Sequence, residues 1–483
     1  MEIERSVKIM AKEYDLVILG GGTGGYVAAI RASQLGLKTA VVEKGKLGGT
    51  CLHNGCIPSK ALLRSAEVYA TAKKSEEFGI ITSDIRLDFN RVQERKSSII
   101  SQLHSGVQYL MKKGKIDVYE GNGRIMGPSI FSPMPGTISV EMNNGEENEM
   151  LIPKNVIIAT GSRPKTLPGL EIDGSTVISS EEALQMEELP KSIIIVGGGV
   201  IGVEWASMLA DFDVKVTILE YSDRLVPTED KEISKELQRI LKKKGIKIVT
   251  GAKVLADTVQ KNSSSVTIQA EKNGDIQTFE GDKLLVSVGR IGNVEGIGLE
   301  NTEIAVANNV IETNKYYQTK ESHIYAIGDC IGGLQLAHVA SHEGIIAVEH
   351  IAGENPQPLD YKTVSKCIYT SPEISSVGYT EEEAIALGFT IKKGKFSFKA
   401  IGKALIYGEQ DGFVKIITDQ ETDDLLGVHI IGAHATDLIA EAALAKVLDA
   451  TAWEISNTIH PHPSLTEAIG EAALAVEGKA IHS

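Results

Sequence analysis

The sequence repeats one unit: a short apolar strand, a turn with glycines at its first, third and sixth positions, a helical pattern, and a strand that ends in glutamate. The first copy has its turn at residues 20–25 and ends at Glu43, and the second has its turn at residues 197–202 and ends at Glu220. In both copies the acid stands eighteen positions after the last glycine of the turn. Such glycines allow a tight turn and let the backbone approach a pyrophosphate at the positive start of the helix. The repeat therefore predicts an α/β protein with two dinucleotide sites, one in each of two domains.

The glycines and the acids of these units have different expected roles. The glycines expected to lie against the nucleotides are Gly20, Gly22 and Gly25 in the first copy and Gly197, Gly199 and Gly202 in the second. Each acid is placed to bond ribose hydroxyls, although Glu43 could instead be a solvated strand end. Glu220 favours NAD over NADP, because a carboxylate would repel a 2′-phosphate, but Arg224 nearby keeps the choice open.

Two cysteines, Cys51 and Cys56, follow the first unit in the stretch Gly48–Lys60. Five residues of a regular helix rise about 7.5 Å, which is more than the roughly 4.4–6.8 Å that a disulfide allows between Cα atoms. We therefore expect the Cys51 end to be unwound, which the neighbouring glycines permit, and the strained disulfide to be easily reduced. Two unrelated buried thiols are the alternative in an intracellular chain.

Composition and charge exclude several classes of protein. A chain of 483 residues is long enough for several domains, and four cysteines are too few for a disulfide framework, so a reducing compartment, the cytoplasm, is expected. A formal charge of -15 argues against nucleic acid and anionic membranes as partners and suits a basic protein partner. Residues 1–13 are expected to be a tail rather than a signal or transit peptide, and no apolar run is long enough to cross a membrane.

The remaining patterns predict further elements. Helices are expected over residues 61–74, 89–113, 233–244 and 335–347, apolar strands over 156–158 and 324–327, and a linker over 164–190. From about residue 356 the pattern changes to an α+β domain without a nucleotide loop, with strands over 367–369, 413–418 and 426–431 and helices over 381–387 and 437–448.

Two sites in these later segments carry polar groups with more than one interpretation. Asp329 follows an apolar strand, so its side chain either caps the turn or binds a ribityl or ribose hydroxyl. Near the C-terminus, His462 and Glu467 stand at the start of a helix predicted over residues 464–477, with Pro463 at its beginning. They are either cap residues or a base and the group that orients it.

Taken together, these stretches resemble the flavin-dependent disulfide oxidoreductases of the class I pyridine nucleotide-disulfide oxidoreductase family, and within it the lipoamide branch. The resemblance covers residues 14–478. Its most specific markers are Leu47–Lys60, Ala159-Thr160-Gly161, Gly328-Asp329, Leu336-Ala337-His338 and His460-Pro461-His462-Pro463. Pro58-Ser59-Lys60 resembles the lipoamide and mercuric branches rather than the glutathione branch.

The resemblance implies two Rossmann-like dinucleotide-binding domains plus a C-terminal α+β dimerisation domain. An FAD-binding domain would cover residues 1–155 and be completed by residues 288–355, with an NAD-binding domain at 156–287 and the interface domain at 356–483. Besides the glycines and acids named above, the implied cofactor contacts are Gly49, Thr50, Lys60, Thr160, Gly161, Gly328, Asp329 and Ala337. No metal site is implied.

The resemblance also assigns catalytic roles. Cys51 matches the thiol that meets the substrate, and Cys56 matches the thiol against the flavin. His462 matches a base held by Glu467, and in the family this base reaches the cysteines of the other subunit, which implies an obligate homodimer with composite active sites. Lys60 and Glu204 match an ion pair beside the flavin.

Three more residues depart from these roles. Cys330 and Cys367 match no reactive position, and both are expected to be buried. His53 stands two residues after Cys51, where the family more often has asparagine, so an effect on the thiols is an open question.

The function implied is oxidation of protein-bound dihydrolipoyl groups through the disulfide and FAD, with hydride passed to NAD. The partners would be the lipoyl domain and the core acyltransferase of a 2-oxo-acid dehydrogenase complex. Residues 115–170 and 47–60 look most like the branched-chain version. The competing hypotheses are a reductase that uses NADPH to reduce a small disulfide, and a flavoprotein whose main role is assembly within a larger complex.

Overall fold

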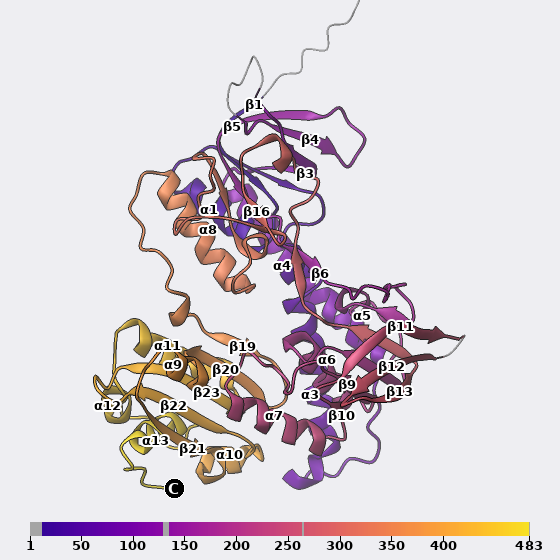
Figure 1. Ribbon diagram of the computed structural model, residues 1–483, viewed down its shortest axis with the longest axis vertical. Coiled ribbons are helices and arrows are strands. Elements are labelled where there is room, and N and C mark those ends of the chain that lie inside the picture. The colour runs from indigo at the N-terminus through magenta and orange to yellow at the C-terminus, as the bar shows by residue number, and fades with distance from the viewer. Residues whose placement is uncertain (1–11, 129–134, 263–264, 483) are drawn as a thin grey trace, which may run out of the picture. The chain divides into compact units, whose positions relative to one another are not determined.

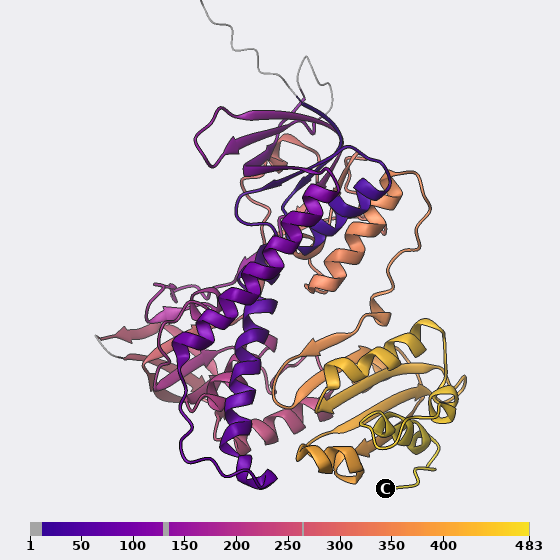
Figure 2. The same ribbon diagram turned by 180° about the vertical axis from the view of Figure 1, so that it is seen from behind.

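The computed structural model describes residues 12–128, 135–262 and 265–482 (Figures 1 and 2). Its contacts divide the chain into two compact units. The first contains the residues up to Ser59, Glu94–Lys165 and Arg290–Leu359, and the second contains Lys60–Gln93, Thr166–Gly289 and the residues from Asp360 onward.

The first unit is built on a six-stranded sheet in which β1 pairs in parallel with both β2 and β5, and β18 extends β5. Its strands are β1 (Lys12–Leu19), β2 (Thr39–Glu43), β3 (Asp117–Ile125), β4 (Ile138–Met142), β5 (Glu149–Ile158) and β18 (Ile324–Ala326). Parts of the inner strands, residues 16–19 of β1, 40–42 of β2 and 156–158 of β5, are continuous apolar runs that are buried, as is usual where a parallel sheet is covered on both faces.

Two helices, α1 (Thr23–Gln34) and α8 (Ala337–Ile351), lie side by side in this unit (Figures 1 and 2). They approach closely because glycines face each other: a Cβ on Gly24 would lie 3.1 Å from the Ala340 carbonyl oxygen, and one on Gly344 would lie 2.9 Å from the Gly24 oxygen. The buried face of α1 is made of small residues, which brings the start of the helix close to the sheet.

The second unit contains a five-stranded parallel sheet in the order β10-β9-β8-β14-β7, on which α6 (Val200–Asp211) packs. Its strands are β7 (Val177–Ile178), β8 (Ser192–Val196), β9 (Lys215–Leu219), β10 (Lys247–Val249) and β14 (Lys283–Val286). A three-stranded antiparallel meander adjoins it, formed by β11 (Lys253–Lys261), β12 (Val266–Lys272) and β13 (Asp275–Gly281). The sequence patterns did not predict this meander.

A second sheet in the same unit is antiparallel, in the order β19-β20-β23-β22-β21. Its strands are β19 (Lys366–Ile368), β20 (Glu373–Gly378), β21 (Ile391–Ser397), β22 (Phe413–Asp419) and β23 (Leu425–Gly432). Helices α11 (Ala435–Val447) and α13 (Glu467–Val476) pack on it. Their shared core is a cluster of aliphatic and aromatic side chains that includes Phe398, Ile430 and Ile469. The predicted fold class, two dinucleotide-type α/β sheets followed by an α+β domain, is confirmed.

Several predictions about local structure need correction. Residues 164–190 are not a plain linker, because they contain β7 and the short helix α5 (Ser180–Ala183), which a capping box at Ser179 and Glu182 begins. The expected boundary before residue 156 falls inside β5. Of the expected tail, residues 12 and 13 begin β1, and residues 1–11 lie outside the described residues.

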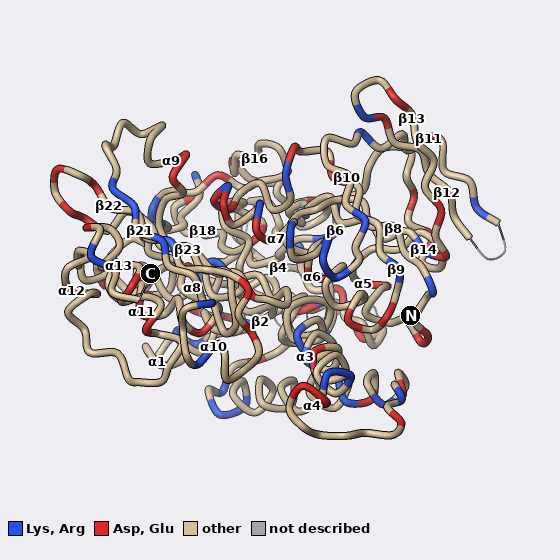
Figure 3. The backbone as a smooth tube through the Cα atoms, turned by 90° about the horizontal axis from the view of Figure 1, so that it is seen from below, with Lys and Arg blue, Asp and Glu red and all other residues tan. Residues whose placement is uncertain are grey.

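Charged residues of both signs are interspersed along the backbone (Figure 3), so the net charge of -15 is not carried by one segment. Among the helices in the described part of the chain, none is both long and apolar enough to cross a bilayer.

Candidate active site

The first glycine turn has the geometry that only glycine allows. Gly20 has φ +107°, and a Cβ there would lie 2.2 Å from the Ala159 carbonyl oxygen. A Cβ on Gly25 would lie 1.9 Å from the Gly20 oxygen. Gly22 is the N-cap of α1, and no side chain of the described residues caps that helix. The N–H groups of the first turn are therefore oriented for an anionic ligand such as a pyrophosphate.

Glu43 closes the turn rather than ending its strand in solvent. Its Oε2 accepts a hydrogen bond from the Gly21 N–H at 2.7 Å, and its Oε1 accepts one from the Gly45 N–H at 2.6 Å. A carboxylate oxygen can accept more than one bond, so the same group remains able to accept from ribose hydroxyls.

The second turn repeats this construction. Gly197 also has φ +107°, with its added Cβ 2.4 Å from the Ser287 oxygen, and a Cβ on Gly202 would lie 1.9 Å from the Gly197 oxygen. Glu220 is buried, and its carboxylate accepts hydrogen bonds from the N–H of Gly198 and from that of Ser222, the latter at 2.6 Å. α6 begins after Gly199, also without a side-chain cap among the described residues. Both turns thus fit an adenine dinucleotide.

Thr160 and Gly161 are joined to a later segment of the chain. The Thr160 hydroxyl donates to the Asn293 carbonyl oxygen at 2.6 Å, and the Asn293 side-chain amide donates back to the Thr160 oxygen at 3.0 Å. The Asn293 N–H donates to the Gly161 oxygen at 2.9 Å. Gly161 has φ +69°, and nothing would lie within 4 Å of a Cβ there.

Asp329 does more than cap a turn, because its carboxylate accepts a hydrogen bond from the Ser162 hydroxyl. The Arg290 Nε donates to the same Ser162 oxygen at 2.7 Å, and its guanidinium lies 3.9 Å from Asp329. Sequence reasoning missed Ser162 and Arg290. The one available signal was the pair Gly289-Arg290, three residues beyond the apolar strand β14.

The residues after Asp329 lead into α8. Gly328 has φ +72°, and its N–H donates to the carboxylate of the buried Glu343 at 2.7 Å. α8 begins at Ala337 with Leu336 as N-cap, and within the described residues no side chain caps it. The N–H groups of its first turn are therefore available to a polar group of a ligand.

The cysteine segment is a helix broken between its two thiols. Cys51 lies in the short helix α2 (Gly49–His53), and α3 (Cys56–Lys73) begins at Cys56. The break falls at residues 54–55, where a Cβ on Gly55 would lie 2.9 Å from the Thr50 oxygen. The expectation of an interrupted helix is confirmed, but the expectation that the Cys51 end is unwound is wrong.

The start of this segment is fixed against the first glycine turn. The Gly48 N–H donates to the Gly21 oxygen at 2.8 Å. Gly49 has φ +57°, and a Cβ there would lie 2.6 Å from the Gly22 Cα. The half-buried Cys51 therefore lies only two residues after Gly49, whose backbone contacts the predicted dinucleotide site.

His53 lies beside a second histidine. His53 Nε2 and His104 Nδ1 lie 2.9 and 3.0 Å from the same Leu47 carbonyl oxygen, and the two rings meet edge to face. Burial lowers the pKa of His53, while its bond to Leu47 acts in the opposite direction. Near neutral pH the His53 ring is therefore mainly uncharged, and its Nε2–H donates a hydrogen bond to the Leu47 carbonyl oxygen.

Lys60 and Glu204 form the predicted ion pair, with Nζ and Oε2 2.7 Å apart. Glu204 is buried, and its other oxygen accepts from the Tyr369 N–H at 2.9 Å. The Lys60 ammonium also lies over the Tyr369 ring, 4.6 Å from its centre. The two charges are fixed by these three contacts, so Lys60 and Glu204 are not a loose ion pair on the surface.

His462 and Glu467 are also joined as expected. His462 Nδ1 lies 2.8 Å from Glu467 Oε1, while Oε2 accepts from the Ser464 N–H at 2.8 Å. Burial raises the pKa of Glu467, but the bonds from Ser464 and His462 outweigh burial and lower it, so the carboxylate stays ionised. The His462 side chain is 79% exposed, which leaves Nε2 accessible.

The helix after His462 begins later than predicted. α13 starts at Glu467 instead of residue 464, because the Glu467 carboxylate holds the preceding turn through the Ser464 N–H. His460, the other histidine of the motif, lies 2.7 Å from Glu441, which raises the pKa of His460.

The two other cysteines differ from each other. Cys330 is fully buried, as predicted, and burial raises the pKa of its thiol to about 11. Cys367 is only half-buried, which corrects the prediction, although burial still raises its pKa to about 12. Both thiols stay protonated near neutral pH and are therefore poor nucleophiles.

Comparison with known proteins agrees with this geometry. The chain matches the pyridine nucleotide-disulphide oxidoreductase family over residues 14–344, and the dimerisation domain of that family over residues 364–473. The chain belongs to the pyridine nucleotide-disulphide oxidoreductases. It is 71% identical over 473 residues to a dihydrolipoyl dehydrogenase of Bacillus subtilis (strain 168), with 98% of this chain and 100% of that protein covered.

Solved structures give the same picture. The chain superimposes on LpdA from Mycobacterium tuberculosis with a TM-score of 0.87 at 26% identity, covering 96% of this chain and 99% of that one. It also resembles the HOCl-induced flavoprotein disulfide reductase RclA from Escherichia coli, with a TM-score of 0.82 at 27% identity, covering 95% and 99%. The predicted family, enzyme class and cofactors, FAD and NAD, are confirmed at the level of the family, and the dimerisation domain supports the predicted homodimer.

Proposed function

We propose that this protein oxidises protein-bound dihydrolipoyl groups to lipoyl groups, using Cys51 and Cys56 as a redox-active pair, and passes the electrons to NAD. The observation that carries the proposal is the broken helix of the cysteine segment, fixed by Gly48 and Gly49 against the first glycine turn. In the structure Cys51 is a half-buried and Cys56 an exposed free thiol, and the proposal is that they form an exchangeable disulfide next to the dinucleotide bound at the first turn. The similarity to dihydrolipoyl dehydrogenases supports the choice of substrate.

In this proposal FAD would be held at the first turn, in the FAD-binding domain of residues 1–155 and 288–355, and Asp329 and the start of α8 would also contact it. NAD would be held at the second turn, in the predicted domain of residues 156–287 without the end of β5, and residues 356–483 would form the interface between subunits. When bound, FAD would take two electrons from the thiol pair and pass them on as hydride to NAD. Lys60, held by Glu204, would supply positive charge beside the flavin.

The thiol chemistry is a pair of disulfide exchanges. His462 takes the proton of one dihydrolipoyl thiol, and the thiolate attacks the Cys51 sulfur, so the Cys51–Cys56 bond breaks and Cys56 leaves as a thiolate. The second lipoyl thiol attacks the first lipoyl sulfur and gives its proton to Cys51, which leaves as a thiol when the mixed disulfide breaks. The lipoyl disulfide is then closed and both cysteines are reduced. Glu467 holds the imidazole in the tautomer that accepts the proton.

The proposed assembly is an obligate homodimer in which the His462 of one subunit serves the cysteines of the other. The proposed partners are the lipoyl domain and core acyltransferase of a 2-oxo-acid dehydrogenase complex. The branched-chain complex is one candidate. The low cysteine content supports the cytoplasm as the site of action. The similarity to a flavoprotein disulfide reductase favours, as a second candidate, reduction of a small disulfide with NADPH.

Turnover with defined substrates tests this choice. The purified yellow protein is mixed with dihydrolipoamide and NAD, and NADH formation is followed, with NADP and oxidised glutathione as comparison substrates. We expect NADH to form with dihydrolipoamide. Preference for NADPH in reducing the flavin, with no oxidation of dihydrolipoamide, would instead support the reductase, and failure of all these reactions would leave the assembly role.

A further inference from the structure

Arg224 is the one lysine or arginine between residues 216 and 230, the segment that follows the second nucleotide strand. It stands four residues after Glu220, the acid expected to bond the ribose hydroxyl that carries the 2′-phosphate in NADP. A guanidinium is well suited to bind such a phosphate through two parallel hydrogen bonds. A free arginine here would therefore oppose the selectivity for NAD that Glu220 gives.

The structure shows Arg224 engaged elsewhere. Its Nη1 donates to Glu382 Oε1 at 2.7 Å, and its Nη2 donates to the backbone oxygens of Pro227 at 3.0 Å and Glu229 at 3.4 Å. The Arg224 side chain is 23% exposed, against 44% for Glu382. These three bonds occupy both terminal nitrogens of the guanidinium, and the carboxylate neutralises its charge.

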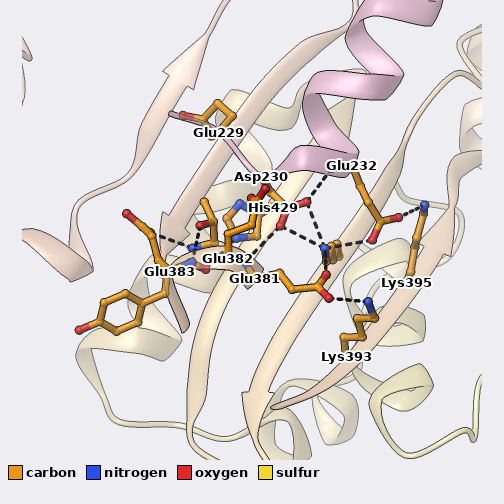
Figure 4. Close-up of polar contacts among 12 residues, drawn as sticks. Glu229, Asp230, Glu232, Glu381, Glu382, Glu383, Lys393, Lys395 and His429 are labelled. Carbon is orange, nitrogen blue, oxygen red and sulfur yellow. Dashed lines mark hydrogen bonds and ion pairs between the residues drawn. The ribbon is translucent and has the colours of Figure 1, made fainter. Parts of the chain in front are cut away.

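Glu382 is itself fixed by its helix. α9 (Glu381–Ala386) begins with a capping box in which Thr380 and Glu383 bond each other's backbone N–H groups. Glu381 bonds Lys393 and the buried Lys415. Figure 4 shows these three consecutive glutamates next to Asp230, at the start of α7 (Lys231–Lys243).

The same network joins α9 to the nucleotide-binding part of the second unit. Lys415 is almost fully buried and bonds Asp230 at 3.0 Å, and Asp230 in turn accepts from the Glu381 N–H at 3.2 Å. Because α9 is anchored through Glu381 and Glu383, on both sides of Glu382, the backbone of Glu382 is held close to Arg224. Glu382 is therefore presented to Arg224 by an anchored helix and not by a loose surface segment.

We propose that Glu382 is a specificity-determining residue: it holds the Arg224 guanidinium away from the position of a 2′-phosphate, so that Glu220 alone decides between NAD and NADP. Glu382 acts through Arg224 and is a positioning residue, since it does not itself touch the nucleotide. The inference rests on the proposed function only in placing the pyridine nucleotide at the second turn.

The experiment compares binding of adenosine 2′,5′-bisphosphate with that of AMP, which lacks the 2′-phosphate, by calorimetry on the flavin-loaded dimer. The variants are Glu382→Gln, Arg224→Met and the double variant, and Glu236→Gln is the matched control because Glu236 pairs with the surface residue Arg239 in the same unit. We expect Glu382→Gln to tighten adenosine 2′,5′-bisphosphate by about tenfold, the worth of one bond to a charged group, with AMP unchanged.

The remaining variants decide whether the gain passes through Arg224. The double variant and the control should both bind adenosine 2′,5′-bisphosphate as the wild type does. A Glu382→Gln variant whose ratio of the two affinities is unchanged, or a double variant that keeps the gain, would overturn the inference. The proposed function is judged separately, because wild-type protein that fails to form NADH from NAD and dihydrolipoamide would contradict that proposal whatever these ratios are.

Discussion

The two glycine turns are nearly identical in backbone but differ in what surrounds them. Gly20 and Gly197 share φ +107°, and Gly25 and Gly202 share the 1.9 Å approach to a carbonyl oxygen. Around the first turn, Gly49 lies against the turn and α8 lies against α1. At the second turn, nothing would lie within 4 Å of a Cβ on Gly199, and the side chain of the following residue, Val200, is 40% exposed.

This difference teaches how one local solution serves two purposes. An enclosed turn suits a cofactor that stays bound through many reaction cycles, whereas an open turn suits a nucleotide that must enter and leave on each cycle. The backbone supplies affinity for the pyrophosphate in both cases, and the surrounding elements determine the rate of exchange. Four predictions test this contrast.

The largest effect is expected from adding a methyl group to either turn. Gly25→Ala would place a Cβ against the Gly20 oxygen, so we expect the protein to lose its flavin and all activity. Gly202→Ala makes the same clash in the second turn, and overpacking of this kind costs about 1–3 kcal/mol. We expect that variant to keep its flavin and its reduction by dihydrolipoamide, with NAD-dependent turnover reduced about 10- to 100-fold. Flavin absorbance and steady-state rates measure both, and loss of flavin from both variants would contradict the contrast.

Removing the proposed base separates thiol chemistry from nucleotide binding. His462→Ala should lower turnover of dihydrolipoamide by about 10²- to 10⁴-fold, the usual range for one acid-base group. The flavin should remain bound, because His462 belongs to neither glycine turn. Glu467→Gln, which keeps a bond to His462, should cost less. A wild-type rate in His462→Ala would remove this histidine from the mechanism.

A smaller effect is expected from neutralising the second acid. Glu220→Gln weakens the bonds from Gly198 and Ser222, and a bond to a charged group is worth about 1.5–3 kcal/mol against roughly 1 for a neutral one. We expect the KM for NAD to rise about tenfold with flavin content unchanged. The matched change, Glu43→Gln, should lower flavin retention and leave the KM for NAD unaltered. An equal effect of either variant on both ligands would show that the turns are not independent.

The smallest effect concerns acid stability of the second unit. His429 is fully buried, and burial lowers its pKa below the ordinary 6.5, although the Asp230 carboxylate acts in the opposite direction. The unfolded chain therefore binds one more proton below about pH 6.5, so the free energy of unfolding falls as pH drops, by at most about 1.4 kcal/mol per pH unit. Chemical unfolding at about pH 7.5 and 5.5 should show a smaller pH dependence for His429→Gln. An unchanged dependence would contradict this.

The turns and their acids could be predicted because local rules fix them. A glycine that must have positive φ or touch a carbonyl leaves a mark at a set spacing, and an acid at a strand end repeats that spacing. The predicted helix Phe89–Lys113 has the observed bounds for a similar reason, since its apolar positions recur with helical period over its whole length.

The break in the cysteine segment shows the limit of such rules. Distance arguments required a break between Cys51 and Cys56, but three glycines nearby offered several places for it. The close approach of Gly55 to the Thr50 oxygen selects one, and that contact is not visible in spacing alone.

Bonds between distant parts of the chain could not be predicted at all. The hydrogen bonds from Arg290 to Ser162 and from Ser162 to Asp329 join residues 128 and 167 positions apart. The same holds for the bond between Arg224 and Glu382, which lie 158 positions apart. Ser162, Arg290 and Glu382 look like ordinary polar surface residues until the fold brings the segments together.

The most direct test of the account is the absorption spectrum of two single variants of the flavin-loaded protein. Cys51→Ser leaves the Cys56 thiolate against the oxidised flavin, so a long-wavelength charge-transfer band is expected in that variant and not in Cys56→Ser. The band in Cys56→Ser instead, or in neither variant, would contradict the proposed order of the two thiols.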